Sequence, residues 1–229
     1  MKFGIVTFPG SNCDQDMRHV LRNVLSQDTI CLWHKDVDLQ NCDVIVLPGG
    51  FSYGDYLRSG AIAKFSNIMN SIINFANRGG FVIGICNGFQ ILCESKLLPG
   101  ALLQNDSHKF ICKNTYLNVT SNSSRFTSNY SLNQVLKVPV AHGEGRYHAD
   151  ENTLNSLKEN DQIIFQYCNS KGEIDISSNI NGSALNIAGI CNKNRNVFGM
   201  MPHPERASDS ELNNTDGINF FLSAIESIT

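Results

Sequence analysis

The sequence predicts an α/β domain in which helices cover both faces of an open, mostly parallel sheet. Its first half alternates almost wholly apolar runs, rich in Val and Ile, with segments of amphipathic helical spacing. Apolar runs of this kind are typical of parallel strands, because both faces of such a sheet are covered. From about residue 97 onward, short alternating segments between polar turns predict antiparallel or mixed strands added to the parallel sheet.

The order of elements in the first half predicts βαβ units with right-handed crossovers. Two segments with apolar residues at helical spacing, 14–26 and 61–77, are predicted helices. The apolar runs before and after them are predicted strands: residues 2–7, 29–34, 43–47 and 81–85.

The second half is predicted to hold shorter strands and longer loops. The stretch 121–133 is rich in Ser and Asn and is a predicted loop, and a helix is expected over 216–227. The predicted strands are residues 115–119, 162–167, 183–190 and 197–201. No repeat or linker divides the chain, so we expect residues 1–229 to form a single domain.

Composition excludes several classes of function. The 229 residues can bury a substantial core, and a net charge of −3 gives no basic field for nucleic acid or anionic lipid. We find no apolar run long enough to span a bilayer and no signal peptide. The eight cysteines are scattered, without CxxC pairs or zinc-ligand spacing, so we expect free thiols, no metal site and a cytoplasmic protein.

A single cysteine stands between two glycines in GICNG, residues 84–88, after a predicted strand and before a helical segment. This pattern is typical of a nucleophile elbow, a turn so tight that only small residues fit two positions away, as Gly84 and Gly88 do. The N-terminus of the following helix favours a thiolate. We therefore predict that Cys86 is a nucleophile and that the remaining thiols are packing residues: Cys13, Cys31, Cys42, Cys93, Cys112, Cys168 and Cys191.

A cysteine nucleophile needs a base, and the base needs an orienting group. We predict His203 as the base and Glu205 as its partner, because they follow a predicted strand whose carboxyl end meets the edge of the sheet where Cys86 lies. A second His-x-Glu arrangement, His142 and Glu144, remains an alternative as base or as a wall of the pocket. The other histidines are expected to make surface hydrogen bonds: His19, His34, His108 and His148.

The glycine-rich turn LPGGFSYGD, residues 47–55, follows another predicted strand. Phosphate binding is not favoured, since neither GxGxxG nor a Walker sequence is present. An oxyanion hole fits better, with the backbone N–H of Gly50 joining that of Asn87, the residue after the nucleophile. A tight turn without function remains the plain alternative.

Taken together, these motifs resemble class I (triad) glutamine amidotransferases, whose fold is flavodoxin-like. KFGIVTFPGSNCDQD, GGFSYGDYLRSGA, GICNGFQIL, LLPGALLQNDSHKF, VAHGEGRY and MMPHPER more closely resemble the glutaminase subunits of phosphoribosylformylglycinamidine synthase. The resemblance runs from residue 2 to residue 206. It is least familiar over 121–133 and 151–195.

The resemblance implies an activity and partners. Such subunits hydrolyse glutamine to glutamate and ammonia through a Cys thioester. The ammonia passes to a PurL-type synthetase subunit, which uses ATP and Mg²⁺ to convert formylglycinamide ribonucleotide to its amidine in purine (IMP) biosynthesis; a small PurS-type subunit is also expected. By the same resemblance Cys86, His203 and Glu205 form the triad, Gly50 and Asn87 donate to the oxyanion, and Gln90 contacts glutamine. No cofactor is expected on this chain.

Three other hypotheses remain open from the sequence. The chain could be a triad glutaminase that serves another synthetase, or a non-catalytic regulatory subunit with the same fold. A flavodoxin-like nucleotide binder is disfavoured because the phosphate fingerprint is missing.

Overall fold

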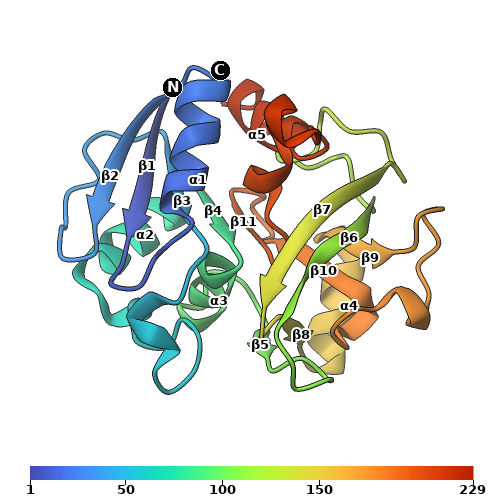
Figure 1. The fold of residues 1–229 in the computed structure, drawn as a ribbon. Helices are drawn as coiled ribbons and strands as arrows, with labels where there is room; N and C mark the ends of the chain where they lie inside the picture. Colours follow the sequence, from blue (N-terminus) through green and yellow to red (C-terminus); the bar gives the residue numbers. More distant parts are fainter. Residues whose placement is uncertain (229) are drawn as a thin grey trace.

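The computed structural model describes residues 1–228 and places a nine-stranded sheet at the centre of the molecule (Figure 1). Five neighbouring strands are mutually parallel, in the order β2-β1-β3-β4-β11. With β11 as the fifth parallel strand, this is the flavodoxin-like order, in which ligands bind beyond the carboxyl ends of the strands. These strands are β1 (Lys2–Thr7), β2 (Asp28–Trp33), β3 (Val44–Leu47), β4 (Phe81–Ile85) and β11 (Val197–Met200).

The sheet continues past β11 as an antiparallel half, in the order β10-β9-β6-β7. A separate two-stranded ladder joins β5 to β8. The prediction of a parallel sheet with antiparallel additions is therefore confirmed. The added strands are β5 (Ala101–Leu103), β6 (Ile111–Val119), β7 (Val135–His142), β8 (Arg146–His148), β9 (Ile163–Cys168) and β10 (Ile187–Cys191).

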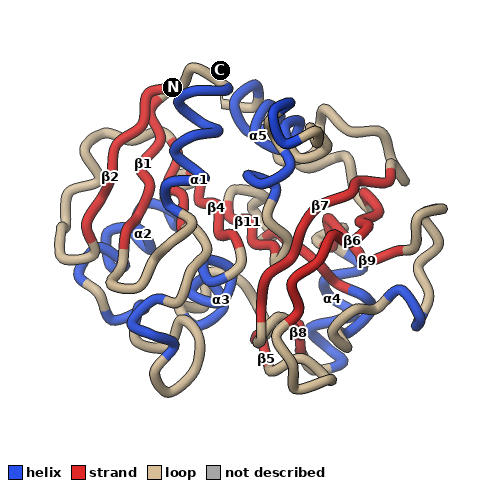
Figure 2. The backbone as a smooth tube through the Cα atoms, viewed as in Figure 1, coloured by secondary structure: helices blue, strands red, loops and turns tan. Residues whose placement is uncertain are grey.

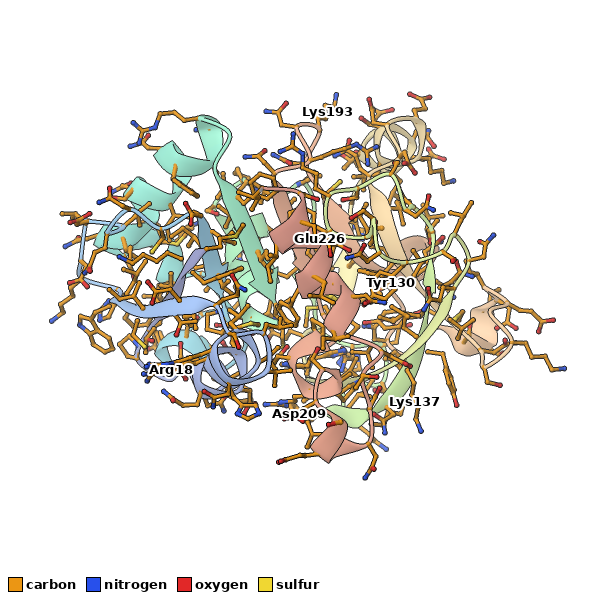
Figure 3. The ribbon with its side chains drawn as sticks, turned by 90° about the horizontal axis from the view of Figure 1, so that it is seen from above. Arg18, Tyr130, Lys137, Lys193, Asp209 and Glu226 are labelled. Carbon is orange, nitrogen blue, oxygen red and sulfur yellow. The ribbon has the colours of Figure 1, made fainter. Side chains whose placement is uncertain are left out.

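Helices cover both faces of the sheet, as the βαβ pattern predicts. Viewed from above, α1, which carries Arg18, lies on the opposite side of the strands from the green-blue α2 (Figure 3). Helix α3 packs against β3, β4 and β11, where its N-terminus meets the carboxyl end of β4. The helices are α1 (Asp14–Arg18), which continues as a π-helix (His19–Val24), α2 (Asn67–Asn77), α3 (Asn87–Glu94), α4 (Glu151–Glu159) and α5 (Ile218–Glu226).

Several predicted boundaries are wrong; Figure 2 shows the helices, strands and loops as the structure has them. Helix α2 begins at Asn67 rather than at residue 61, because Ser66 takes an extended N-cap conformation with φ −65° and ψ 147°. Before it lie turns and one 3₁₀ turn over Ala63–Phe65. The predicted strand 183–190 begins only at residue 187, since Leu185 takes a left-handed conformation with φ 53°.

Four elements of the second half were not predicted from the sequence: β5, β7, β8 and α4. Strand β7 contains Pro139, which cannot donate to a ladder and which signals against a strand in the sequence. Helix α4 is mostly polar and buries only Leu157. Its start is fixed instead by Asp150, whose side chain accepts a hydrogen bond from Thr153 N at 2.7 Å.

The core consists of the strands that the apolar runs predict. All residues of β3, β4 and β11 are buried. Among residues 1–228, the helices are all too short or too polar to cross a membrane.

Candidate active site

The chain turns sharply between β4 and α3, and the turn residue is Cys86. Its backbone has φ 52° and ψ −106°, a conformation that residues other than glycine rarely adopt. A Cβ at Gly84 would stand 2.7 Å from the carbonyl oxygen of Gly88, and one at Gly88 would collide with the carbonyl of Leu47 on β3. Strand, strained residue and helix therefore form the elbow that the sequence predicts.

The Cys86 thiol lies at the N-terminal end of α3, next to strand β7. Its Sγ is 3.7 Å from the carbonyl oxygen of Ala141, and its backbone N–H donates to Met200 O at 2.7 Å. The residue is 5% exposed, and it lines a cavity. The residue thus lies at the border between the hydrophobic core and this cavity.

His203 and Glu205 follow β11 in a turn stiffened by Pro202 and Pro204. His203 Nδ1 and Glu205 Oε1 are 2.6 Å apart, and the two residues are 1% and 2% exposed. Burial works to lower the pKa of His203, but the Glu205 carboxylate and then the Cys86 sulfur outweigh it, and the pKa lies well above its ordinary value. This is the arrangement of a base and its orienting group.

The three residues predicted as a triad therefore meet at one edge of the sheet. Cys86 lies close enough to His203 for the charge on its sulfur to raise the pKa of the imidazole. Nε2 of His203 is buried and has no hydrogen-bond partner among residues 1–228, so it is available to exchange a proton with the thiol.

A cavity of about 220 Å³ opens above the sulfur. The predicted oxyanion donors adjoin it: Gly50 lines the cavity, and Asn87 is the first residue of α3, where backbone N–H groups have no partner within a helix. Gly50 has φ 139°, and a Cβ there would lie 2.8 Å from Asn12 N, so the close approach of the two loops requires glycine.

Gln90 also lines the cavity, and its amide is held at both ends. Its Nε2 donates to Glu144 O at 2.6 Å, and its Oε1 accepts from Asn87 Nδ2 at 2.9 Å. The Glu144 carboxylate accepts from Ser59 N at 3.2 Å. The alternative pair His142 and Glu144 therefore lines this cavity, with the Glu144 carboxylate bound to Ser59 rather than to its own histidine.

Charged groups of both signs surround the mouth of the cavity. Asp55, Glu144 and Lys109 all line it. Burial raises the pKa of Asp55 to about 6, against a hydrogen bond from Ser59 that lowers it. The cavity can therefore receive an ammonium and a carboxylate at once.

Cys13, set aside as packing in the sequence, lies beside His203. A Cβ at Gly49 would stand 2.7 Å from His203 Cε1 and 3.1 Å from Cys13 Sγ, and Arg206 Nη2 is 3.1 Å from the same sulfur. Cys13, His203 and Glu205 offer ligand atoms within 4.8 Å of one another, which could hold a metal ion such as zinc. Only the motifs PGSNCDQD and MMPHPER signal this neighbourhood in the sequence.

Other expectations about cysteine and histidine need correction. All eight cysteines are free thiols, but Cys31 and Cys112 are exposed and so are not packing residues. His34 is buried against Tyr53, with Nδ1 2.6 Å from the hydroxyl. The expectation of a surface hydrogen bond is confirmed for His108, which is exposed, with Nδ1 3.0 Å from Gln104 Oε1, although this residue also lines the active-site cavity.

Comparison with known proteins agrees with this geometry. The family model described as "CobB/CobQ-like glutamine amidotransferase domain" matches residues 1–219. A protein of Koribacter versatilis named phosphoribosylformylglycinamidine synthase subunit PurQ is 56% identical over 225 residues, covering 98% of this chain and 97% of its own. One of the same name from Synechocystis is 56% identical over 221 residues, covering 96% of this chain and 99% of its own.

Solved structures give the same result. A chain in the structure titled PurLQS from Thermotoga maritima is 40% identical, with a TM-score of 0.87 over 100% of this chain and 99% of that one. The glutaminase domain of Trypanosoma brucei CTPS, at 14% identity and a TM-score of 0.59, shares the fold alone; it covers 98% of this chain and 94% of that one.

The fold and site define a glutamine amidotransferase of the triad class, and the chain belongs to the CobB/CobQ-like glutamine amidotransferase family. Within that family it belongs with the PurQ subunits of phosphoribosylformylglycinamidine synthase.

Proposed function

We propose that this chain is the glutaminase subunit of phosphoribosylformylglycinamidine synthase. It hydrolyses glutamine and delivers ammonia to an ATP-using synthetase, which converts formylglycinamide ribonucleotide to formylglycinamidine ribonucleotide in purine biosynthesis. One observation carries the proposal: Cys86 lies on a strained elbow and lines a cavity, with the His203–Glu205 pair nearby. The proposal treats residues 1–229 as one amidotransferase domain, in a cytoplasmic protein.

The geometry supports a thioester mechanism. The Cys86 thiolate adds to the carboxamide carbon, and the oxyanion that forms accepts hydrogen bonds from the N–H groups of Gly50 and Asn87. The His203 imidazolium, stabilised by Glu205, gives its proton to the nitrogen as the carbon–nitrogen bond breaks. Water then attacks the thioester, with neutral His203 taking its proton, and glutamate leaves.

The charge around the cavity supports an amino acid as substrate. The side chain of glutamine must reach the sulfur, so its ammonium and carboxylate stay near the mouth. Ionised Asp55 and Glu144 complement the ammonium, and Lys109 complements the carboxylate. Gln90, fixed between Asn87 and Glu144, adds a rigid polar wall.

The pKa shifts of the two candidate bases, His142 and His203, support His203 as the base. Burial, and then the charge on His203, lowers the pKa of His142 to about 4, so His142 is a poor proton acceptor near neutral pH. The pKa of His203 is shifted in the opposite direction by Glu205 and Cys86. A base must hold the thiol proton and return it to the leaving group, which favours His203.

The partners follow from the relatives. The PurQ name and the PurLQS complex of Thermotoga maritima support a PurL-type synthetase and a small PurS-type subunit as partners. ATP and Mg²⁺ are then used on the synthetase, and no cofactor is assigned to this chain. A docked partner also shelters ammonia from protonation by bulk water.

Substitution of the nucleophile tests the proposal. In the reconstituted complex, Cys86→Ala should abolish glutamine-dependent synthesis and spare synthesis from added ammonium, because only the step that releases ammonia needs the thiol. Formation of the amidine product is measured with each nitrogen source, and Cys31→Ala, at an exposed thiol, is the control. Glutamine use retained by Cys86→Ala would reject the nucleophile assignment.

A further inference from the structure

The side chain of Asn87 is buried directly after the nucleophile, and both of its polar atoms are hydrogen-bonded. The residue is 2% exposed. Its Oδ1 accepts from Ser52 N at 3.1 Å. Its Nδ2 donates to Gln90 Oε1 at 2.9 Å and to Asp55 Oδ1 at 3.4 Å. Because a backbone N–H only donates, the bond from Ser52 fixes which end of the amide is the oxygen.

These bonds are part of a closed network. Gln90 Nε2 donates to Glu144 O, and the Glu144 carboxylate accepts from Ser59 N. Ser52 and Ser59 belong to one loop, so the network returns to the segment from which it starts. It joins three segments beside the cavity: the loop after β3, the N-terminus of α3 and the turn after β7.

The loop between Ser52 and Ser59 is strained and needs such fixed points. Tyr53, Asp55 and Leu57 have φ values of 55°, 53° and 73°. A left-handed residue other than glycine costs on the order of 1–2 kcal/mol. Leu57 is 83% exposed, so burial of its side chain does little to offset that cost. Hydrogen bonds at the ends of the loop therefore hold its conformation.

The position of this loop matters because it follows Gly50, which lies two residues before Ser52. Phe51 N donates to Gly10 O at 3.0 Å, which holds this stretch to the segment after β1. The bond from Ser52 N to the Asn87 side chain holds it to the first residue of α3. An oxyanion donor acts at about 2.7–3.1 Å from the oxygen, so a small shift of the loop would weaken it.

We propose that the side chain of Asn87 is a positioning residue for the oxyanion hole. By binding Ser52 N it sets the separation between the N–H of Gly50 and the N–H of Asn87 itself. The inference rests on the glutaminase function proposed above. The side chain acts through the loop and through Gln90, whereas only the backbone N–H of Asn87 binds the oxyanion.

Substitutions at residue 87 separate the side chain from the backbone donor, because they all retain the N–H. In the reconstituted complex, Asn87→Leu removes every side-chain hydrogen bond at a similar volume. We expect kcat for glutamine to fall by about tenfold to a hundredfold, approaching the loss of one oxyanion donor. KM should change by no more than about threefold, because Gln90 keeps its bond to Glu144 O.

A second variant, Asn87→Asp, has nearly the same shape. It keeps an acceptor for Ser52 N but sets an oxygen against Gln90 Oε1 and a carboxylate close to Asp55. Its kcat should fall at least as far as that of Asn87→Leu, since a negative charge also lies near the developing oxyanion. If Asn87→Leu loses synthesis from added ammonium, and so does not fold or dock, the kcat of Asn87→Asp decides in its place.

Alkylation of Cys86 distinguishes positioning from damage to the elbow. Reaction with iodoacetamide, followed by mass spectrometry of the Cys86 peptide, needs a thiolate but no oxyanion hole, so its rate in Asn87→Leu should stay within about threefold of wild type. Asn23→Asp, at an exposed residue that does not line the cavity, is the control. Wild-type kcat in either folded variant, or equal losses of kcat and of the alkylation rate, would overturn the inference. If the wild-type complex were alkylated at Cys86 but did not hydrolyse glutamine, the proposed function itself would be rejected.

Discussion

Two buried histidines close to each other, His203 and His142, have pKa values shifted in opposite directions. His203 contacts a carboxylate and a sulfur, which favour imidazolium, whereas His142 contacts an amide oxygen and is buried near that positive charge. The difference comes from Glu205 and Cys86, which raise the pKa of His203, and from burial, which lowers that of His142. Identical side chains therefore differ as proton acceptors because of their neighbours.

The low pKa of His142 predicts a pH-dependent stability. The unfolded residue has a pKa near 6.5 and the folded one a pKa of about 4, so between these values only the unfolded chain takes up the proton. The free energy of unfolding should therefore fall as pH drops through this window. From pH 7 to pH 5 this one group accounts for about 2 kcal/mol.

Comparison with His142→Gln isolates that contribution, because Asp55 and His203 titrate in both proteins. Urea denaturation at pH 7, 6 and 5 measures the free energy of unfolding of both proteins. Between pH 7 and pH 5, that of the wild type should fall by about 2 kcal/mol more than that of the variant. If the free energy of unfolding fell equally with pH in both proteins, the pKa of His142 would not differ between the folded and unfolded states.

At the scale of elements, the elbow depends on close packing of α3 against the parallel strands. A Cβ on Gly88 would collide with the backbone carbonyl of Leu47, which cannot move without disturbing β3. Gly79 also lacks a side chain, and its φ is +91°, but a Cβ there meets nothing within 4 Å. Substitutions at these two glycines therefore allow steric crowding at Gly88 to be compared with backbone strain alone at Gly79.

We therefore expect Gly88→Ala to lower the free energy of unfolding by about 3 kcal/mol, because the added methyl group overpacks the contact with β3. Gly79→Ala should lower it by about 1 kcal/mol, because only the left-handed backbone conformation is strained. Urea denaturation measures both. Glutaminase activity should fall in Gly88→Ala, since α3 also positions Asn87 and Gln90. Equal destabilisation by the two substitutions would show that α3 can shift away from β3.

The elbow was predictable because its constraints are local. Gly84, Cys86 and Gly88 fall within five residues, between an apolar run and a helical pattern. The same holds for the parallel strands, whose burial on both faces leaves a continuous apolar signal. Strand β7 gave no such signal, since it includes a proline and its buried positions alternate with partly buried or exposed ones.

The neighbours of the triad were less predictable because they depend on contacts between distant segments. Asn105 reaches His142 across 37 positions, and Arg206 reaches Cys13 across 193. Neither pair has a spacing that sequence patterns encode. Their residues appear within recognisable motifs, but only the folded chain shows which atoms meet.

At the scale of the whole molecule, the loop 121–133 connects both halves of the sheet to the last helix. Phe126 is fully buried, with its ring centroid 5.9 Å from that of Phe81 on β4, 5.1 Å from Phe198 on β11 and 6.0 Å from Phe220 on α5. The Tyr130 hydroxyl donates to Asp216 O at 2.7 Å, beside α5, where Figure 3 labels Glu226. A Ser- and Asn-rich loop thus contributes to the core.

Phe126→Ala should therefore cost about 3–5 kcal/mol of unfolding free energy, the usual loss for a buried aromatic ring. Leu132 lies in the same loop but is 53% exposed, so Leu132→Ala should change stability by no more than about 0.5 kcal/mol. Thermal and urea denaturation of both variants measure this contrast. Because Phe81 and Phe198 lie on the strands that lead to Cys86 and His203, the cavity left by Phe126→Ala should also lower glutaminase activity in the complex. Similar stability of the two variants would show that the loop only covers the core and does not complete it.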